Sequence, residues 1–258
     1  MSAVIFKQPF EPVGCSQCRT LEGLDFQFTM AFQPILDVRT GVPFAYEALV
    51  RGLKGESAAH ILGQVNEQNL YRFDQACRVK AIELAAGLGL ASLPDCRLSI
   101  NFLPNAVYRA STCIRATLEA ARLFEFPAQR LMFEVTEGER IADPQHLKSI
   151  FAEYERQGFT TAIDDFGSGY SGLNLLAEFQ PQVLKLDMAL TRNIDADPVR
   201  EAIVAGIVLV ASRLKITLIA EGVETPAERD ALAGLGIHLM QGYLFARPEV
   251  GRLPLSSC

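Results

Sequence analysis

Charged and amide residues recur at regular intervals in the apolar segments of this chain. Each such segment has the composition of a buried strand, and the polar residue lies at or near its carboxyl end. The residues are Glu47, Asn101, Glu134, Asp164 with Asp165, Lys185, Glu221 and Gln241. Because buried strands are usually apolar almost throughout, polar residues repeated at their ends indicate one shared site.

Several carboxylates in one place repel each other, so protons or cations must neutralise them. Ligands that offer only oxygen favour hard cations such as Mg²⁺, Mn²⁺ or Ca²⁺. Neighbours on a strand point to opposite faces, so Asp164 and Asp165 can share a site only if the strand ends there, and Gly167 and Gly169 fit such an end. A carboxylate shared by two cations would create a two-metal centre, which activates water and stabilises phosphoryl oxygens. The pattern therefore predicts a metal-dependent hydrolase.

Each residue also has an ordinary structural explanation when it is considered alone. Glu47 could form a surface salt bridge, Lys185 could protect an edge strand, and Asn101 could end a strand. Their joint occurrence at the ends of successive strands favours the site. The three histidines fall outside this pattern and are expected to be structural or surface residues: His60, His146 and His238. The glycine-rich segment 167–172 lacks the lysine of a phosphate-binding P-loop.

Alternating strands and helices must position these residues. Strands are predicted over 28–38, 43–52, 96–102, 130–137, 161–166, 181–188, 216–223 and 238–245. Helices are predicted over 66–88, 111–123, 144–157, 197–214 and 225–235, with a short helix after the glycine-rich segment 167–172. The first two strands are joined by a turn too short for a crossover and should pair antiparallel. The other links suit right-handed parallel crossovers.

The predicted fold is therefore of the α/β class, a modified (β/α)8 TIM-type barrel with one antiparallel strand. In such barrels, the carboxyl ends of the strands converge on the face that holds the active site. A doubly wound open sheet is the alternative. We predict an N-terminal extension over 1–27, one domain over 28–250 and a tail over 251–258.

The composition of the chain limits the kinds of ligand that it is expected to bind. The chain has 258 residues and a net charge of −6, which argues against nucleic acid as the main partner but permits a small phosphorylated ligand beside bound cations. The apolar run 202–211 is too short to span a membrane, and the N-terminus does not read as a signal peptide, so a cytoplasmic location is expected. Cys15 and Cys18 are predicted to be reduced thiols, with a redox switch or an intermolecular metal site as alternatives.

Six motifs resemble those of the EAL-domain family. They are YEALVRG (46–52), FEVTE (133–137), AIDDFGSGYSGLNLL (162–176), LKLD (184–187), AEGVET (220–225) and QGYLFARP (241–248). The resemblance covers about 28–250 and implies hydrolysis of cyclic di-GMP to linear pGpG with two Mg²⁺ or Mn²⁺ ions. The loop after Asp165 differs mildly from the family pattern, with Ser168 and Gly172 at positions where Thr and Ser are common.

The resemblance also implies roles for individual residues. The implied metal ligands are Glu47, Asn101, Glu134, Asp164, Asp165 and Glu221, with Asp164 bridging the two ions. The implied catalytic residues are Glu47, Asp165, Lys185 and Glu221, with Lys185 beside the attacking water and Asp165 as a general base. The implied substrate contacts are Gln33, Arg51, Asn101 and Gln241. Glu137 would brace the 166–172 loop, which in the family links the metal site to a dimer interface, so a homodimer is expected.

Two other functions are open at this point. The chain could be a silent receptor that binds cyclic di-GMP and signals to a protein partner, or an interaction module that binds no nucleotide. The complete set of acidic residues together with Lys185 favours the enzyme.

Overall fold

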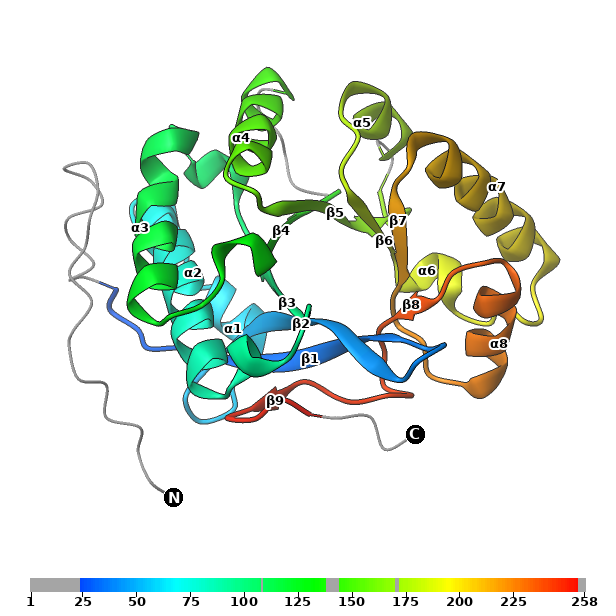
Figure 1. Cartoon of the computed structure of the whole chain (residues 1–258), viewed down its shortest axis with the longest axis horizontal. Helices are drawn as coiled ribbons and strands as arrows, with labels where there is room; N and C mark the ends of the chain where they lie inside the picture. Colours follow the sequence, from blue (N-terminus) through cyan, green and yellow to red (C-terminus); the bar gives the residue numbers. More distant parts are fainter. Residues whose placement is uncertain (1–23, 108, 138–143, 170–171, 255–258) are drawn as a thin grey trace.

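The strands of the protein close into a barrel (Figure 1). A computed structural model describes residues 24–107, 109–137, 144–169 and 172–254. The strands are β1 (Thr29–Asp37), β2 (Val42–Arg51), β3 (Arg97–Asn101), β4 (Leu131–Thr136), β5 (Thr160–Phe166), β6 (Val183–Leu186), β7 (Thr217–Ala220), β8 (Leu239–Met240) and β9 (Glu249–Val250). From β2 to β8 they pair in parallel in chain order.

Strand β1 closes the barrel and is its one reversed member. It pairs antiparallel with β2 on one side and with β8 on the other. The predicted barrel with one antiparallel strand is therefore confirmed, and the open-sheet alternative is wrong. Strand β9 was not expected. It adds to β1 with Val250 opposite Ala31, and two residues are too few to produce a recognisable alternation in the sequence.

Helices surround the barrel and follow most strands. They are α1 (Ala58–Leu62), α2 (Leu70–Gly87), α3 (Ala110–Leu123), α4 (Pro144–Arg156), α5 (Gly172–Glu178), α6 (Met188–Thr191), α7 (Pro198–Leu214) and α8 (Pro226–Gly234), with short 3₁₀ turns at Leu90–Ser92, Pro104–Ala106 and Ala128–Arg130. No helix in these described ranges is long and apolar enough to cross a membrane.

Local hydrogen bonds explain where two helices begin. The helix predicted over 66–88 starts only at Leu70, because the Asn69 side chain accepts a hydrogen bond from the Asn66 amide at 2.7 Å and holds a turn there. Helix α8 starts after a capping box in which Thr225 and Glu228 bond each other's backbone amides, an arrangement typical of helix N-termini. Helices α1 and α6 were not predicted, since one turn carries little periodicity.

An apolar layer inside the barrel lies beneath the polar residues. It consists of Ile35, Ala45, Met132, Ala162, Val183, Ile219 and Leu239, one from nearly every strand. Residues two positions apart on a strand share a face. Glu47, Glu134, Asp164, Lys185, Glu221 and Gln241 each come two residues after a member of this layer. The strand pleat that buries the apolar layer therefore also stacks the polar residues above it.

Candidate metal and substrate site

A cavity of about 420 Å³ opens at the carboxyl ends of the barrel strands. Seven residues predicted for the site line it: Gln33, Glu47, Asn101, Asp164, Asp165, Glu221 and Gln241. Glu134 and Lys185 are wholly buried beside it. The sequence pattern missed other lining residues, among them Leu49, Thr136, Met188, Glu224 and Tyr243. Leu49 and Met188 are apolar, and Glu224 and Tyr243 lie in loops, so no polar signal within a strand marked them. Thr136 is a polar residue at the end of β4, and the pattern overlooked it.

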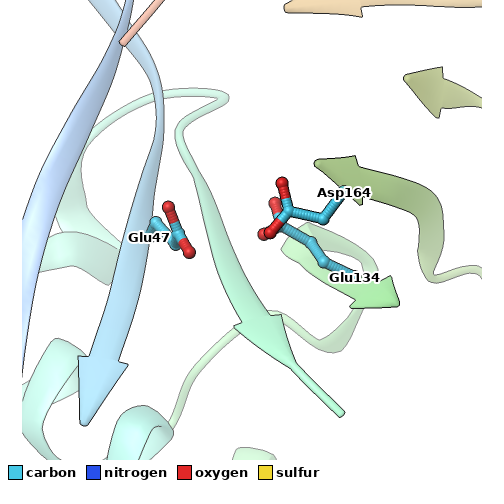
Figure 2. A group of neighbouring side chains, drawn as sticks. All are labelled: Glu47, Glu134 and Asp164. Atoms are coloured by element: carbon cyan, nitrogen blue, oxygen red, sulfur yellow. The ribbon is translucent and has the colours of Figure 1, made fainter. Parts of the chain in front are cut away.

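Two groups of carboxylates could each hold a metal ion. Glu47, Glu134 and Asp164 come from β2, β4 and β5, and one oxygen of each lies within 4.8 Å of the others. Figure 2 shows these three side chains pointing toward one another across the barrel end. Asp164, Asp165 and Glu221 meet the same criterion. Asp164 belongs to both groups, so the geometry suits two ions that share one carboxylate.

A bulge in β5 lets both adjacent aspartates face the cavity. Strand β5 ends at Phe166, which pairs with Leu186, so the strand end predicted just before Gly167 is confirmed. The pairing register shifts between Ile163 and Phe166, and Asp165 takes a left-handed backbone conformation with φ of 54°. An extra residue in a strand turns its neighbour's side chain to the other face. The bulge just before the strand end, which the sequence did not predict, therefore brings Asp165 to the cavity beside Asp164.

The Lys185 ammonium lies at the centre of the acidic residues. Its Nζ atom is 2.9 Å from Glu134, 2.9 Å from Glu221, 3.0 Å from Asp164 and 3.4 Å from Glu47. Its side chain has no exposed surface. Burial lowers the lysine pKa, but the four carboxylates outweigh it and hold the pKa well above its usual range. The side chain therefore carries a positive charge in the metal-free site.

Neutral donors fix the orientation of two carboxylates. Asn101 and Gln241 donate to the two oxygens of Glu47 at 2.9 and 2.8 Å, and Gln241 also donates to Gln33 at 3.1 Å. The Ser99 hydroxyl, which the sequence pattern missed, donates to Glu134 inside the barrel. Ser99 lies two residues before Asn101 on β3, so the alternation of that strand could have revealed it.

Burial and mutual repulsion raise the pKa values of the acidic residues. Burial, reinforced by Glu47 and Asp164, raises the pKa of Glu134 to about 8. Burial, followed by repulsion from Asp164, raises the pKa of Asp165 to about 6. The same causes hold the pKa of Glu221 well above its usual range. These carboxylates therefore bind protons readily, and a metal cation that binds to them would displace the protons.

Glu137 connects the site to the loop that follows β5. Its carboxylate accepts a hydrogen bond from the Gly167 amide at 2.7 Å, and its own amide donates to the Asp164 carbonyl at 2.9 Å. A Cβ atom at Gly169 would approach the Glu137 carboxylate to 2.9 Å, and one at Gly172 would come within 2.8 Å of the Phe166 ring. The glycines therefore allow the loop to pack directly on Glu137.

Some predicted residues lie elsewhere. Arg51 ends β2, donates to the Val50 carbonyl at 2.7 Å and is not among the residues that line the cavity. The three histidines lie apart from the cavity, as expected: His60 in α1, His146 in α4 and His238 just before β8. Cys15 and Cys18, with most of the predicted 1–27 extension, fall outside the described residues.

The charges of the site fit a pair of divalent cations. When ionised, the carboxylates of the two groups and the Lys185 ammonium together carry a net charge of −4. Two divalent ions would balance this charge. The ligand atoms are all oxygens, which suits Mg²⁺, Mn²⁺ or Ca²⁺, and such a centre can activate water and bind phosphate oxygens.

Comparison with known proteins shows the family to which the chain is similar. The sequence model described as "EAL domain" matches residues 20–248. A standalone versatile EAL protein from Vibrio cholerae O395, solved in a c-di-GMP-bound form, is 56% identical with a TM-score of 0.87, and the match covers 91% of this chain and 98% of that one. The manganese and cyclic di-GMP complex of BlrP1 from Klebsiella pneumoniae is 34% identical with a TM-score of 0.81, covering 88% of this chain and 58% of that one.

Curated relatives in Escherichia coli K12 are longer proteins. The blue light- and temperature-regulated antirepressor BluF is 30% identical over 224 residues, which are 87% of this chain and 55% of BluF. The cyclic di-GMP phosphodiesterase PdeF is 29% identical over 233 residues, which are 86% of this chain and 30% of PdeF. The chain therefore spans about half or less of the length of these relatives.

Proposed function

The chain belongs to the EAL-domain family, and on that premise we propose that it is a metal-dependent phosphodiesterase that hydrolyses cyclic di-GMP to linear pGpG. The observation that carries the proposal is the convergence of both carboxylate groups on Lys185 at the mouth of the barrel. Relatives of similar fold bind cyclic di-GMP, in one case together with manganese.

The acidic residues would hold two divalent cations, either Mg²⁺ or Mn²⁺. Glu47, Glu134 and Asp164, with Asn101, would hold the first, and Asp164, Asp165 and Glu221 the second. Two bound cations would lower the pKa of a water between them and stabilise the phosphate oxygens.

The chain's own side chains would guide the reaction. Asp165 faces the cavity beside Asp164, and with the cations bound it would be ionised and able to accept a proton from the attacking water. Lys185 can donate to that water and offset negative charge at phosphorus. The water oxygen would bond to phosphorus as one bond from phosphorus to a ribose 3′ oxygen breaks. The departing 3′ oxygen would take a proton from solvent, and the ring would open to pGpG.

Other residues would hold the substrate. The Oε1 atom of Gln241 is buried and accepts no hydrogen bond from the residues that the structure describes, so it is ready for a donor on the ligand. Gln33 lies beside it. Arg51, at the end of β2, would reach a phosphate with its planar guanidinium group, which requires its side chain to leave the Val50 carbonyl.

The deciding experiment is an assay of the purified protein with cyclic di-GMP and either Mg²⁺ or Mn²⁺, in which pGpG is followed by chromatography. Product should form with at least one metal and disappear with a chelator. Glu47→Ala should abolish it, because Glu47 is a member of the first carboxylate group. A folded wild-type protein that binds the dinucleotide and yields no product with either metal would contradict the proposal.

A regulator of a protein partner is the second candidate. The antirepressor BluF covers most of this chain in alignment, and its name describes control of another protein rather than hydrolysis. If this chain is a receptor that signals to a protein partner, isothermal titration should show cyclic di-GMP binding without turnover. Absence of any nucleotide binding would instead favour a pure interaction module.

Helix α7 is the surface that we propose for a homodimer. Among its residues only Val204 and Ala211 are buried, while Val199, Ile203, Leu209 and Val210 are exposed. A groove lined by Glu137, Phe166 and residues of α5 and α7 lies beside it. Helices α5 and α7 are neighbours in Figure 1. Exposed apolar surfaces of this kind usually meet a partner. Sedimentation should show a dimer that Ile203→Asp weakens, and a wild-type monomer at all micromolar concentrations would contradict it.

The predicted domain bounds and location remain part of this proposal. A fragment over 28–250 should keep the hydrolytic activity if 1–27 is only an extension, and cell fractionation should place the protein in the cytoplasm. Loss of activity on removing 1–27 would show that the extension contributes to the site.

A further inference from the structure

The Lys185 ammonium occupies the place where the two carboxylate groups meet. It contacts Glu47, Glu134 and Asp164, which form the first group, and Glu221, which belongs to the second. Asp164, the residue common to both groups, lies 3.0 Å from Nζ. A single side chain therefore reaches the oxygens of four of the five carboxylates that would bind metal.

The ammonium has fewer hydrogen atoms than acidic neighbours. Lysine carries three N–H donors, whereas four carboxylates lie within 3.4 Å. Its contacts are therefore mainly electrostatic rather than a fixed set of hydrogen bonds. An opposite charge of this kind reduces the repulsion that the carboxylates would otherwise feel in a buried site.

The strand that carries the lysine is held within the barrel. Lys185 lies on β6, whose neighbours β5 and β7 pair with it on both sides, and Val183 fills the apolar layer beneath. Its side chain is fully buried. Cations bound by the same carboxylates must therefore come to rest a few ångströms from a positive charge, where repulsion is strong.

We infer that Lys185 is a built-in counter-cation, which holds the carboxylates together before metal binds and which limits the affinity of the site for divalent metal. The inference rests on the proposed metal-dependent function. It differs from a role confined to orienting water, because that role predicts a loss of turnover without tighter metal binding.

The test measures metal binding without substrate. Mn²⁺ is titrated by calorimetry into metal-free wild type, Lys185→Met and Lys185→Gln. Removing the charge should tighten binding of Mn²⁺ by about tenfold or more, because a neighbouring positive charge is lost. The variants should also melt at a lower temperature than wild type without metal and gain more in melting temperature when Mn²⁺ is added.

Lys148→Met provides the matched control. Lys148 lies exposed on α4, so this variant loses the same charge far from the cavity and should bind Mn²⁺ like wild type. If the Met variant does not fold without cations, the Gln variant keeps a polar side chain in its place. Circular dichroism establishes folding, and the Mn²⁺ dependence of the melting temperature supplies the same affinity ratio.

Unchanged or weaker Mn²⁺ binding by the folded Lys185 variants would overturn the inference, since the lysine would then organise the site without opposing the metal. Tighter binding by Lys148→Met would overturn it as well, because the effect would reflect net charge alone. Failure of wild type to bind Mn²⁺ is a separate result, which would overturn the proposed metal dependence itself.

Discussion

The protein buries two clusters of charged side chains that differ in net charge. One joins α2 to α4: Arg78 bonds Asp74 at 2.7 Å and the Tyr154 hydroxyl at 2.6 Å, while the Leu103 amide donates to Asp74 at 3.0 Å. The Arg78 guanidinium also lies 5.3 Å from the Phe133 ring centre. The other cluster is the barrel-end site, where the carboxylates outnumber the Lys185 ammonium.

The difference separates a structural pair from a binding site. At Arg78, one positive and one negative charge cancel, and aromatic rings cover the pair, so no further ion is needed. At the barrel end the excess negative charge persists, and the pKa values of Glu134 and Asp165 rise as a result of burial and repulsion. Burial of charge alone therefore does not mark a functional site, whereas an unbalanced buried charge does.

Asp164→Asn should produce the largest functional loss. Asp164 belongs to both carboxylate groups, so its removal should lower turnover by well over the roughly 10- to 100-fold typical of substitutions behind a metal ligand. The metal-free protein should be at least as stable as wild type, because one repelling charge is gone. The rate of pGpG formation tests the loss of turnover, and the melting temperature tests the stability of the metal-free variant. Substantial remaining turnover would contradict the view that the unbalanced charge marks the functional site.

Arg78→Met should damage stability instead. It leaves Asp74 buried without its partner, which should cost about 3–5 kcal/mol in the free energy of unfolding, as measured in urea. Adding Asp74→Asn in the same molecule should recover part of that loss. Turnover per folded molecule should stay close to wild type, and a loss of turnover without a loss of stability would show that this cluster is functional after all.

Ser99→Ala should weaken metal binding with little effect on folding. The Ser99 hydroxyl orients Glu134 from inside the barrel, and loss of such a supporting hydrogen bond typically costs about 10- to 100-fold in metal affinity. Thr117→Val is the matched control, because the Thr117 hydroxyl is buried and has no hydrogen-bond partner in the described part of the chain. Equal Mn²⁺ affinities for the two variants would show that the Ser99 hydroxyl does not support metal binding.

The metal-free protein should lose stability as the pH rises from about 5 to 8. The pKa values of Asp165 and Glu134 are raised to about 6 and about 8 in the folded state, so the folded state binds more protons than the unfolded state. Stability from these groups is thus complete below their ordinary pKa values and is lost as the pH passes through the raised ones.

The expected loss of stability is small, and the melting temperature of the metal-free protein between pH 5 and 8.5 measures it. Mn²⁺ should reverse the trend, because cations replace the protons. Glu134→Gln should flatten the profile in the metal-free protein, since it removes the group with a pKa of about 8. If the melting temperature of the metal-free protein stays constant through this pH range, repulsion among the buried carboxylates does not reduce stability.

Much of the fold and site follows from local pattern. Alternation along a strand places Met132 and Glu134 on one face, and the same spacing recurs at Val183 and Lys185. A strand period of two is a local property, so the polar residues could be predicted to stand above an apolar layer. The short turn after Asp37 likewise required antiparallel pairing of the first two strands.

The sequence by itself determined which residues carry charge and which strand end each occupies. Only the tertiary structure decided that Asp165 turns inward through a bulge, that Ser99 supports Glu134, and that one ammonium touches four carboxylates. These facts depend on strand register and barrel closure, which bring together residues such as Glu47 and Lys185 that are far apart in the chain. No local period encodes those distances, so the imbalance of charge that distinguishes the site becomes visible only in the folded barrel.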